Sequence, residues 1–334
     1  MELQASFQAR VSFASQERYR IVGADHFECE AIPAGSLRWD GSLPAVGDVV
    51  EARLTGPALA VIETIRPRGA VISRRGPGRS GERQILAANI DVVIMVTALD
   101  RDFNVRRLER YLVLAAECGA ATVIALNKAE LCADLPAAFQ AVAGIAPGAA
   151  CVALSAIESA EPLRAHIGQG TAILLGSSGV GKSTIANALL GQTRQATEAV
   201  REHDARGRHT TTHRMLLPLP AGGWLIDTPG LRELGLWAGQ SALDDVFGDI
   251  ASAAEGCRFR DCTHANEPGC AVAVALEHGL IDASRWASYL KLQAEVRHVT
   301  RATNREAAAT EKQRGKTIHK AMRRHPKRRG EGQA

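Results

Sequence analysis

Apolar and polar positions alternate in short runs at the start of the chain, as in Phe7–Val11 and Val49–Leu54. Turn sequences such as Pro33–Gly35 and Gly47-Asp48 separate these runs. Successive side chains of a strand point to opposite faces, so this alternation predicts short, half-buried strands. About five strands of this length would suit an OB-like β-barrel, which we predict over residues 1–72, although the pattern also allows another small β domain.

The pattern changes over residues 84–236, where continuous apolar runs alternate with helical stretches such as Val105–Cys118 and Lys182–Leu190. Strands that are buried on both faces and joined by helices indicate an α/β domain with a parallel sheet. Residues 73–83, at the arginine-rich junction between the two regions, are predicted to be a basic linker, either solvated or in contact with nucleic acid. Residues 237–334 have a mainly helical pattern.

Composition and charge describe an ordinary globular chain with one unusual end. Hydrophobic residues make up 46% and charged residues 23%, which argues against a disordered or collagen-like protein. The net charge is +4, but residues 312–329 hold nine Lys or Arg and no acid, so the rest of the chain is net negative. Such a tail is typical of a nucleic-acid arm, or of a solvated disordered end. No apolar run is long enough to cross a membrane, and we expect a cytoplasmic protein.

A phosphate-binding loop follows the apolar run Ala172–Leu175 and precedes a helical stretch. Its pattern is G-x-x-x-x-G-K-S, in the strand–loop–helix context that this motif requires. Backbone N–H groups and the helix N-terminus would surround phosphates, the lysine would reach the β- and γ-phosphates, and the serine hydroxyl would bind Mg²⁺. The predicted nucleotide-binding residues of this loop are Gly176, Ser177, Ser178, Gly179, Val180, Gly181, Lys182 and Ser183.

Two further segments carry residues suited to the γ-phosphate and the metal ion. Asp227 ends the apolar run Trp224–Ile226, where its carboxylate can hold Mg²⁺, and Gly230 can offer its N–H to the γ-phosphate. A threonine of the run 210–212, for which we choose Thr211, can complete the Mg²⁺ coordination from a mobile switch loop. A threonine-rich strand start is the alternative.

Two motifs resemble the guanine-reading segments of GTPases. Asn127, Lys128, Ala129 and Glu130 match N-K-x-D except that glutamate replaces aspartate, which retains the carboxylate one methylene further out. Ser155 and Ala156 resemble the S-A-x turn that supports the base through a backbone N–H. The glutamate keeps open a P-loop ATPase with altered base selectivity.

The motifs stand in an order that is a cyclic permutation of the order in small GTPases. The base motifs precede the phosphate loop, and the threonine run and D-T-P-G follow it. A folded domain whose termini are adjacent tolerates such a rearrangement. Leu231 stands where Ras-like enzymes have a water-orienting glutamine, so we predict His209 for that role. A non-hydrolysing, nucleotide-gated RNA-binding adaptor is the alternative.

A second chemical centre is predicted from the spacing C-x4-C-x-H-x5-C, formed by Cys257, Cys262, His264 and Cys270. Three thiolates and one imidazole make a closed tetrahedral set suited to one structural Zn²⁺ ion. Because protein side chains would fill all four positions, we predict no catalysis at this metal. Reduced core cysteines beside a histidine are the alternative.

Together, N-K-x-E before the phosphate loop, G-R-H-T-T-T, D-T-P-G-L and the cysteine–histidine pattern resemble the circularly permuted RsgA family, the ribosome small-subunit-dependent GTPases A. The resemblance implies an OB-fold, a permuted G domain and a zinc domain. It also implies GTP hydrolysis stimulated by the small (30S) ribosomal subunit, a role in its late maturation, and contact with 16S rRNA. We expect the chain to act as a monomer.

Overall fold

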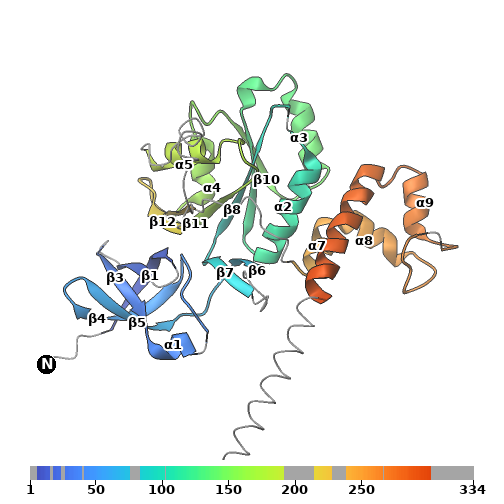
Figure 1. Ribbon diagram of the computed structural model, residues 1–334. Coiled ribbons are helices and arrows are strands. Elements are labelled where there is room, and N and C mark those ends of the chain that lie inside the picture. The colour runs from blue at the N-terminus through green and yellow to red at the C-terminus, as the bar shows by residue number, and fades with distance from the viewer. Residues whose placement is uncertain are drawn as a thin grey trace, which may run out of the picture.

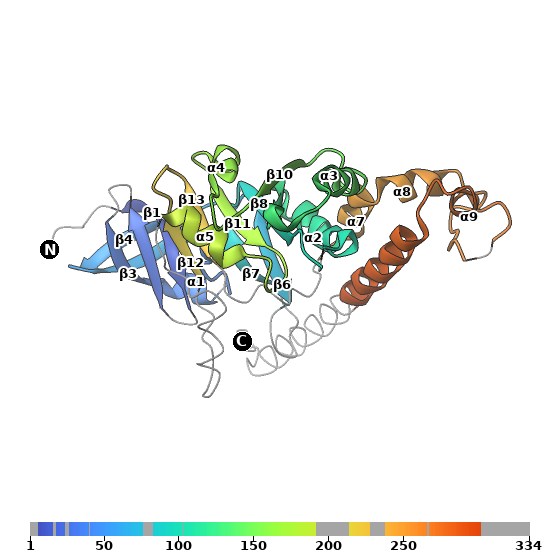
Figure 2. The same cartoon turned by 90° about the horizontal axis from the view of Figure 1, so that it is seen from above.

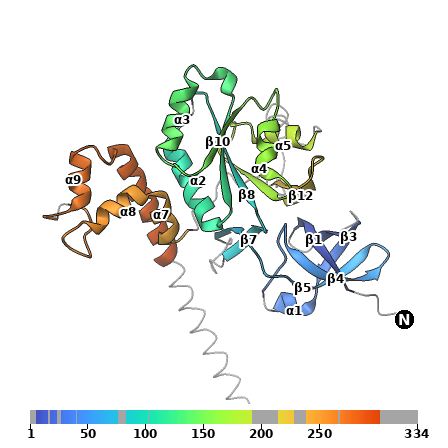
Figure 3. The same cartoon turned by 180° about the vertical axis from the view of Figure 1, so that it is seen from behind.

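The computed structural model describes residues 6–15, 18–23, 27–39, 41–75, 83–101, 103–191, 214–227, 238–265 and 267–301. Figure 1 shows a small β-barrel, a central α/β domain and a group of C-terminal helices. In Figure 3, which views the molecule from behind, the α/β domain again separates the barrel from the C-terminal helices. Among the described residues, no helix is long and apolar enough to cross a membrane.

The barrel closes because its first strand pairs on both sides. The strands follow the order β1-β2-β3-β5-β4, and β4 pairs back onto β1. β3 and β5 are parallel, and the other barrel neighbours are antiparallel. Alternate residues point inward, as in the strictly alternating burial of β3, and the centre contains Val11, Ile21 and Ile62. This arrangement confirms the predicted OB-like barrel. Its elements are β1 (Phe7–Ala14), β2 (Tyr19–Gly23), β3 (Glu28–Pro33), α1 (Gly35–Trp39), β4 (Val49–Gly56) and β5 (Leu59–Ile65).

The α/β domain is built on a sheet with the order β10-β9-β8-β11-β13-β12. All of these neighbours are parallel except the antiparallel β12–β13 pair. β8 and β11 are buried along their whole length, which is why their sequences are continuously apolar. The strands are β8 (Val92–Ala98), β9 (Ala121–Asn127), β10 (Ala150–Leu154), β11 (Thr171–Leu175), β12 (Arg214–Pro218) and β13 (Trp224–Asp227).

Helices cover both faces of this sheet. Val93 and Met95 of β8 pack in one buried cluster with α2 and α3, whereas Ile94 and Val96 pack in another with α4 and α5. The two clusters therefore take alternate residues of the same strand. The helices are α2 (Val105–Cys118), α3 (Leu135–Ala143), α4 (Glu161–Ile167) and α5 (Lys182–Leu190), with a short 3₁₀ turn η1 (Ala129–Leu131) after β9.

The barrel and the α/β domain share one sheet. The end of β1 pairs antiparallel with β12, with Phe13 opposite Met215, so eleven strands form a continuous sheet. Figure 2 shows the barrel lying against β12 and β13. Arg10 of β1 crosses this junction, where its Nη2 donates to Thr171 Oγ1 at 2.9 Å and its guanidinium lies 5.6 Å from the Trp224 ring centroid.

The segment predicted as a basic linker, residues 73–83, begins and ends in strands rather than in open chain. β6 (Val71–Arg75) and β7 (Arg83–Ala88) form an antiparallel two-stranded sheet, with Arg74 opposite Gln84. Arg74 Nε donates to Gln84 Oε1 at 3.1 Å and Arg83 Nε donates to Ser73 Oγ at 2.9 Å across the two strands, whereas the buried Ile72 and Leu86 pack into the core of the α/β domain. Residues 76–82 lie outside the described residues.

The C-terminal region is helical, as the sequence pattern predicts. It contains α7 (Gln240–Val246), α8 (Gly248–Glu255), α9 (Ala271–Glu277) and a further helix over residues 283–301. Phe247 lies fully buried where α7 meets α8 and contacts Tyr289, with ring centroids 5.4 Å apart. The basic tail 312–329 lies outside the described residues.

Candidate functional site

The phosphate-binding loop connects the end of β11 to the start of α5 at the carboxyl edge of the sheet. Gly176 has φ 149°, and a Cβ there would lie 2.3 Å from the Val96 carbonyl oxygen, so only glycine fits. Lys182 begins α5, and its Nζ donates to the Gly176 and Ser177 carbonyl oxygens at 2.8 Å and 2.5 Å. The ammonium is therefore held over the loop, where it can meet a phosphate.

Asn127 joins the candidate base site to this loop. Its side chain is buried, Nδ2 donates to the Val180 carbonyl at 2.8 Å, and Oδ1 accepts from the Ala156 N–H at 3.0 Å. A Cβ on Gly181 would lie 2.1 Å from Asn127 Nδ2, so the loop can approach the amide only with glycine at 181. Three sequence motifs thus meet at one side chain.

The other residues of the base motifs surround this contact. Lys128 adopts φ 61°, and its Nζ pairs with Asp100 Oδ2 at 2.7 Å. Glu130 is exposed in the η1 turn that starts at Ala129. The Ser155 carbonyl accepts from Glu158 and Ser159 N–H groups, which forms the turn after β10.

The candidate Mg²⁺ ligands lie on neighbouring elements. Asp227 ends β13, which pairs with β11, and Ser183 lies in the first turn of α5 directly after the loop. Hydroxyl and carboxylate oxygens are the ligand type that Mg²⁺ prefers. His209, Thr211 and Gly230, as well as Leu231, lie outside the described residues.

Two residues outside the sequence motifs contact the loop from α2. Arg107 Nη1 and Tyr111 Oη each lie 3.4 Å from Ser177 Oγ. Their spacing of four places both on one face of the helix. The sequence signal is the position of α2 directly after β8, the strand that lies beside the loop strand β11 in the sheet.

The four predicted zinc ligands come together in the C-terminal region. Their ligand atoms all lie within 4.8 Å of one another. His264 Nδ1 lies 3.5 Å from both Cys257 Sγ and Cys270 Sγ, and those two sulfur atoms are 4.0 Å apart. Tetrahedral zinc, with Zn–S about 2.3 Å and Zn–N about 2.0 Å, spaces its sulfurs about 3.8 Å apart and sulfur and nitrogen about 3.5 Å apart. The cluster therefore fits a zinc ion.

The surrounding chain holds this cluster in shape. Cys270 caps α9 by accepting from the Ala273 N–H at 3.4 Å. Glu267 accepts from the Thr263 and Ala265 N–H groups, each at 2.9 Å, and so fixes the turn that contains His264. The His264 ring meets Trp286 edge-on at 6.0 Å, which ties the cluster to the helix 283–301. Sequence spacing predicted the ligands but not Glu267 or Trp286.

Two further thiols lie outside this cluster. Burial raises the pKa of the Cys118 and Cys151 thiols to about 11, so both are protonated at neutral pH.

Comparisons with known proteins point to one family of GTPases. The family model for RsgA GTPase matches residues 65–237. Small ribosomal subunit biogenesis GTPase RsgA of Opitutus terrae is 46% identical over 295 residues, which cover 84% of this chain and 80% of the relative. A relative of the same name from Syntrophotalea carbinolica is 40% identical over 339 residues, with coverage of 97% and 93%.

Solved structures agree on the fold. YjeQ from Thermotoga maritima matches with a TM-score of 0.66 at 25% identity, over 87% of this chain and 99% of that one. YloQ, described as a circularly permuted GTPase, matches with a TM-score of 0.65 at 22% identity, over 89% and 97% of the two chains, which supports the fold alone. Sequence, strand order and motif geometry lead to the same result, and the chain belongs to the RsgA GTPase family.

Proposed function

We propose that the chain is a GTP-hydrolysing assembly factor that binds the small ribosomal subunit, acts in its late maturation and is released on hydrolysis. The observation that carries the proposal is Asn127, because its two hydrogen bonds join the base motif, the phosphate loop and the S-A-x turn. Family membership supports GTP hydrolysis, and the names of the relatives given above support the ribosomal role.

In this proposal, separate groups of residues bind the phosphates, the Mg²⁺ ion and the guanine base. The loop Gly176–Ser183 binds the phosphates through its N–H groups, and Lys182 exchanges its loop carbonyls for phosphate oxygens. Ser183, Asp227 and Thr211 would hold Mg²⁺, which neutralises phosphate charge when it is bound. The residues proposed to read guanine are Asn127, Lys128, Ala129, Glu130, Ser155 and Ala156.

Two residues outside the described part of the chain complete the proposed site. Gly230 would donate its N–H to the γ-phosphate, and His209 would orient the attacking water because Leu231 has no polar atom to do so. Fixing that water beside the γ-phosphate accelerates hydrolysis by positioning rather than by covalent chemistry.

The zinc centre is proposed to be structural. Cys257, Cys262, His264 and Cys270 would fill a tetrahedral set completely and leave no position for water or substrate. Reduced thiols persist in a reducing compartment, which supports a cytoplasmic location for the protein.

Contact with 16S rRNA is proposed for the barrel, the zinc region and the basic tail 312–329, with the protein acting as a monomer. The nine Lys or Arg of the tail would neutralise phosphates, so affinity for small subunits should fall steeply as salt rises.

Phosphate release from GTP and from ATP, with and without purified small subunits, tests the proposal. The expected result is turnover of GTP that small subunits stimulate. Tight GTP binding without turnover would support the adaptor instead, and preferred ATP turnover would support the ATPase. The control Lys182→Ala should lose turnover under both conditions, which excludes a contaminating nucleotidase.

The base site has a separate test in Glu130→Asp. If Glu130 accepts hydrogen bonds from guanine, the shorter side chain should change the ratio of GTP to ATP affinity and leave phosphate contacts unaltered. An unchanged ratio would remove Glu130 from the guanine site. Glu158→Asp, in the turn after β10, is the matched control.

A further inference from the structure

Helix α2 lies between the phosphate loop and the C-terminal helices and contacts both. On the loop side, Arg107 and Tyr111 reach Ser177 Oγ, each at 3.4 Å. Ser177 is the second residue of the loop, so these side chains brace the loop from outside.

On its other side, α2 carries a buried carboxylate. The Glu109 side chain is fully buried, and its Oε1 accepts from Arg285 Nη1 at 2.8 Å and from Arg106 Nη1 at 2.5 Å. Arg285 is itself only 8% exposed and forms two hydrogen bonds with Asp249, at 2.7 Å and 2.8 Å. Its guanidinium also lies 4.7 Å from the Phe247 ring centroid. One arginine therefore joins α2, α8 and the helix 283–301.

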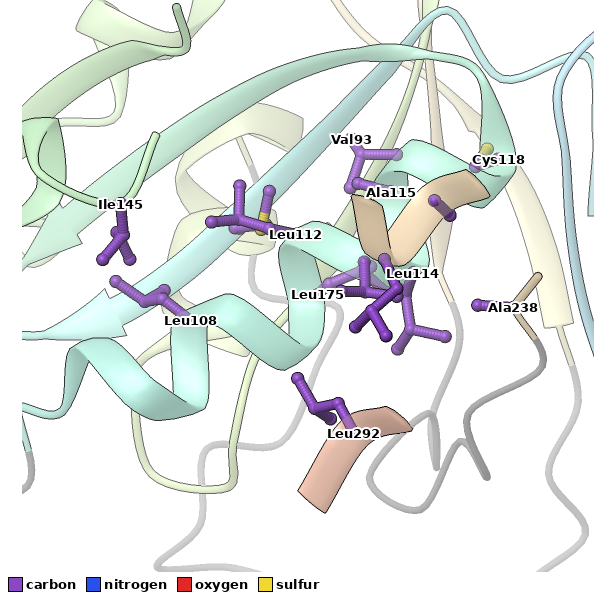
Figure 4. Packing of buried hydrophobic residues seen from close by; sticks show 14 of the residues in the cluster. Val93, Leu108, Leu112, Leu114, Ala115, Cys118, Ile145, Leu175, Ala238 and Leu292 are labelled. Carbon is purple, nitrogen blue, oxygen red and sulfur yellow. The ribbon is translucent and has the colours of Figure 1, made fainter. Parts of the chain in front are cut away.

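Other contacts make this junction continuous along α2. Arg106 pairs with Asp282 at 2.7 Å, and Arg110 pairs with Glu295. Glu117 Oε2 accepts from the Gly239 N–H at 2.8 Å. Figure 4 shows Leu292 and Ala238 beside α2, and both belong to the buried cluster that includes Leu108 and Leu112.

We infer that Arg285, in the C-terminal region, is a positioning residue of the nucleotide site that acts through α2 on Ser177. Arg285 is the more deeply buried of the two arginines that pair with Glu109, so its loss would leave this buried carboxylate with Arg106 and a weaker hold on its position. Arg107 and Tyr111 lie within one turn of Glu109 on the same helix and must follow its movement. Binding linkage is reciprocal, so bound nucleotide must in turn stabilise the seating of residues 282–295 on α2. This coupling needs nucleotide binding but no ribosome.

The test compares Arg285→Met with Arg68→Met in the full-length, zinc-loaded protein. Arg68 is the matched control because it too pairs with a fully buried carboxylate, that of Asp48, with hydrogen bonds of 2.8 Å and 2.7 Å, but within the barrel junction. Both variants should unfold at lower urea concentration. Only Arg285→Met should raise the Kd for GDP, by about fivefold or more, the usual lower range of coupling between sites. Its KM for GTP should rise by a similar factor, and Arg285→Lys should restore part of the affinity.

A double variant and hydrogen exchange test the proposed link through Ser177 independently. Ser177→Ala removes the side-chain link, so adding Arg285→Met to it should change the Kd by much less than in the parent chain. In unaltered protein, GDP should slow hydrogen exchange in residues 282–295. The inference would be overturned if Arg285→Met and the parent chain bound GDP with equal affinity, or if GDP did not change the hydrogen-exchange rates of residues 282–295. Neither result would contradict the proposed ribosomal role.

Discussion

Replacement of Asn127 by alanine separates the structural role of this side chain from its proposed role in reading the base. The change removes two hydrogen bonds and leaves the Val180 carbonyl and the Ala156 N–H, both in buried residues, without their partner. A hydrogen bond of this kind contributes about 1 kcal/mol, and a buried group left unsatisfied costs about 1–3 kcal/mol. We expect Asn127→Ala to lower the free energy of unfolding by about 2–4 kcal/mol without any nucleotide present.

Urea unfolding of nucleotide-free protein measures this loss, and hydrogen exchange at the Ala156 amide localises it. That amide should exchange faster in Asn127→Ala, because the bond that protects it has gone. Asn89→Ala is the matched control, since Asn89 also makes two bonds to backbone, with the Gly47 carbonyl at 3.0 Å and the Gly69 N–H at 2.9 Å. The control should lose comparable stability and keep its GDP affinity.

The reasoning is refuted if Asn127→Ala unfolds at the same urea concentration as the parent chain while losing GDP affinity. Asn127 would then act only on the base, and its contact with Val180 would contribute nothing to the fold.

Three other changes test the metal, the loop and a buried thiol. The parent protein should bind one zinc per chain by elemental analysis; Cys262→Ser should lose it, whereas Cys132→Ser, half-buried outside the cluster, should retain it. Gly181→Ala should raise the Kd for GDP by at least about tenfold, because the new Cβ would lie 2.1 Å from the Asn127 side-chain amide. Gly148→Ala is the control, because its Cβ would meet nothing within 4 Å, and it should leave the Kd unchanged. Equal GDP affinities in the two variants would contradict the loop geometry. Because burial raises the pKa of Cys118 from 9.0 to about 11, its contribution to stability is complete below pH 9 and is lost as pH rises to 11. Cys118→Ala should flatten that part of the pH profile of unfolding, and an identical slope would argue against a buried neutral thiol.

Local spacing was sufficient to predict the strand–loop–helix setting of the phosphate loop and the clustering of three cysteines and one histidine. Gly176 and Gly181 bound a short loop between a buried strand and a helix, and a loop of that kind depends on residues that are neighbours in sequence. Cys257 and Cys270 are similarly close along the chain, so only turns are needed to bring them together. The β-barrel and the parallel sheet were predictable for a related reason, because alternation and continuous apolar runs report directly on one-sided and two-sided burial.

Contacts between distant segments could not be predicted in this way. Arg285 and Glu109 are 176 positions apart, and each looks in sequence like an ordinary charged residue on a helix surface. Arg74 and Arg83 gave the same impression of a solvated linker, yet they lie in paired strands. A charged residue is normally exposed, but it can be buried when an opposite charge lies beside it. Which residue provides that opposite charge depends on how the helices and strands pack, and not on the spacing of residues in the sequence.

The barrel and the α/β domain are joined because the two ends of β1 pair with different strands. Residues Phe7–Arg10 pair with β4 and close the barrel, whereas Phe13 and Ala14 pair with β12. The register with β2 shifts between Val11 and Phe13, where an irregularity bends the strand and turns its end away from β4. β12 is the last strand of the α/β part of the sheet, so without β1 its outer edge would lack a partner for its N–H and C=O groups. The bend in β1 supplies that strand, and so the barrel is fixed to the same sheet that carries the phosphate loop.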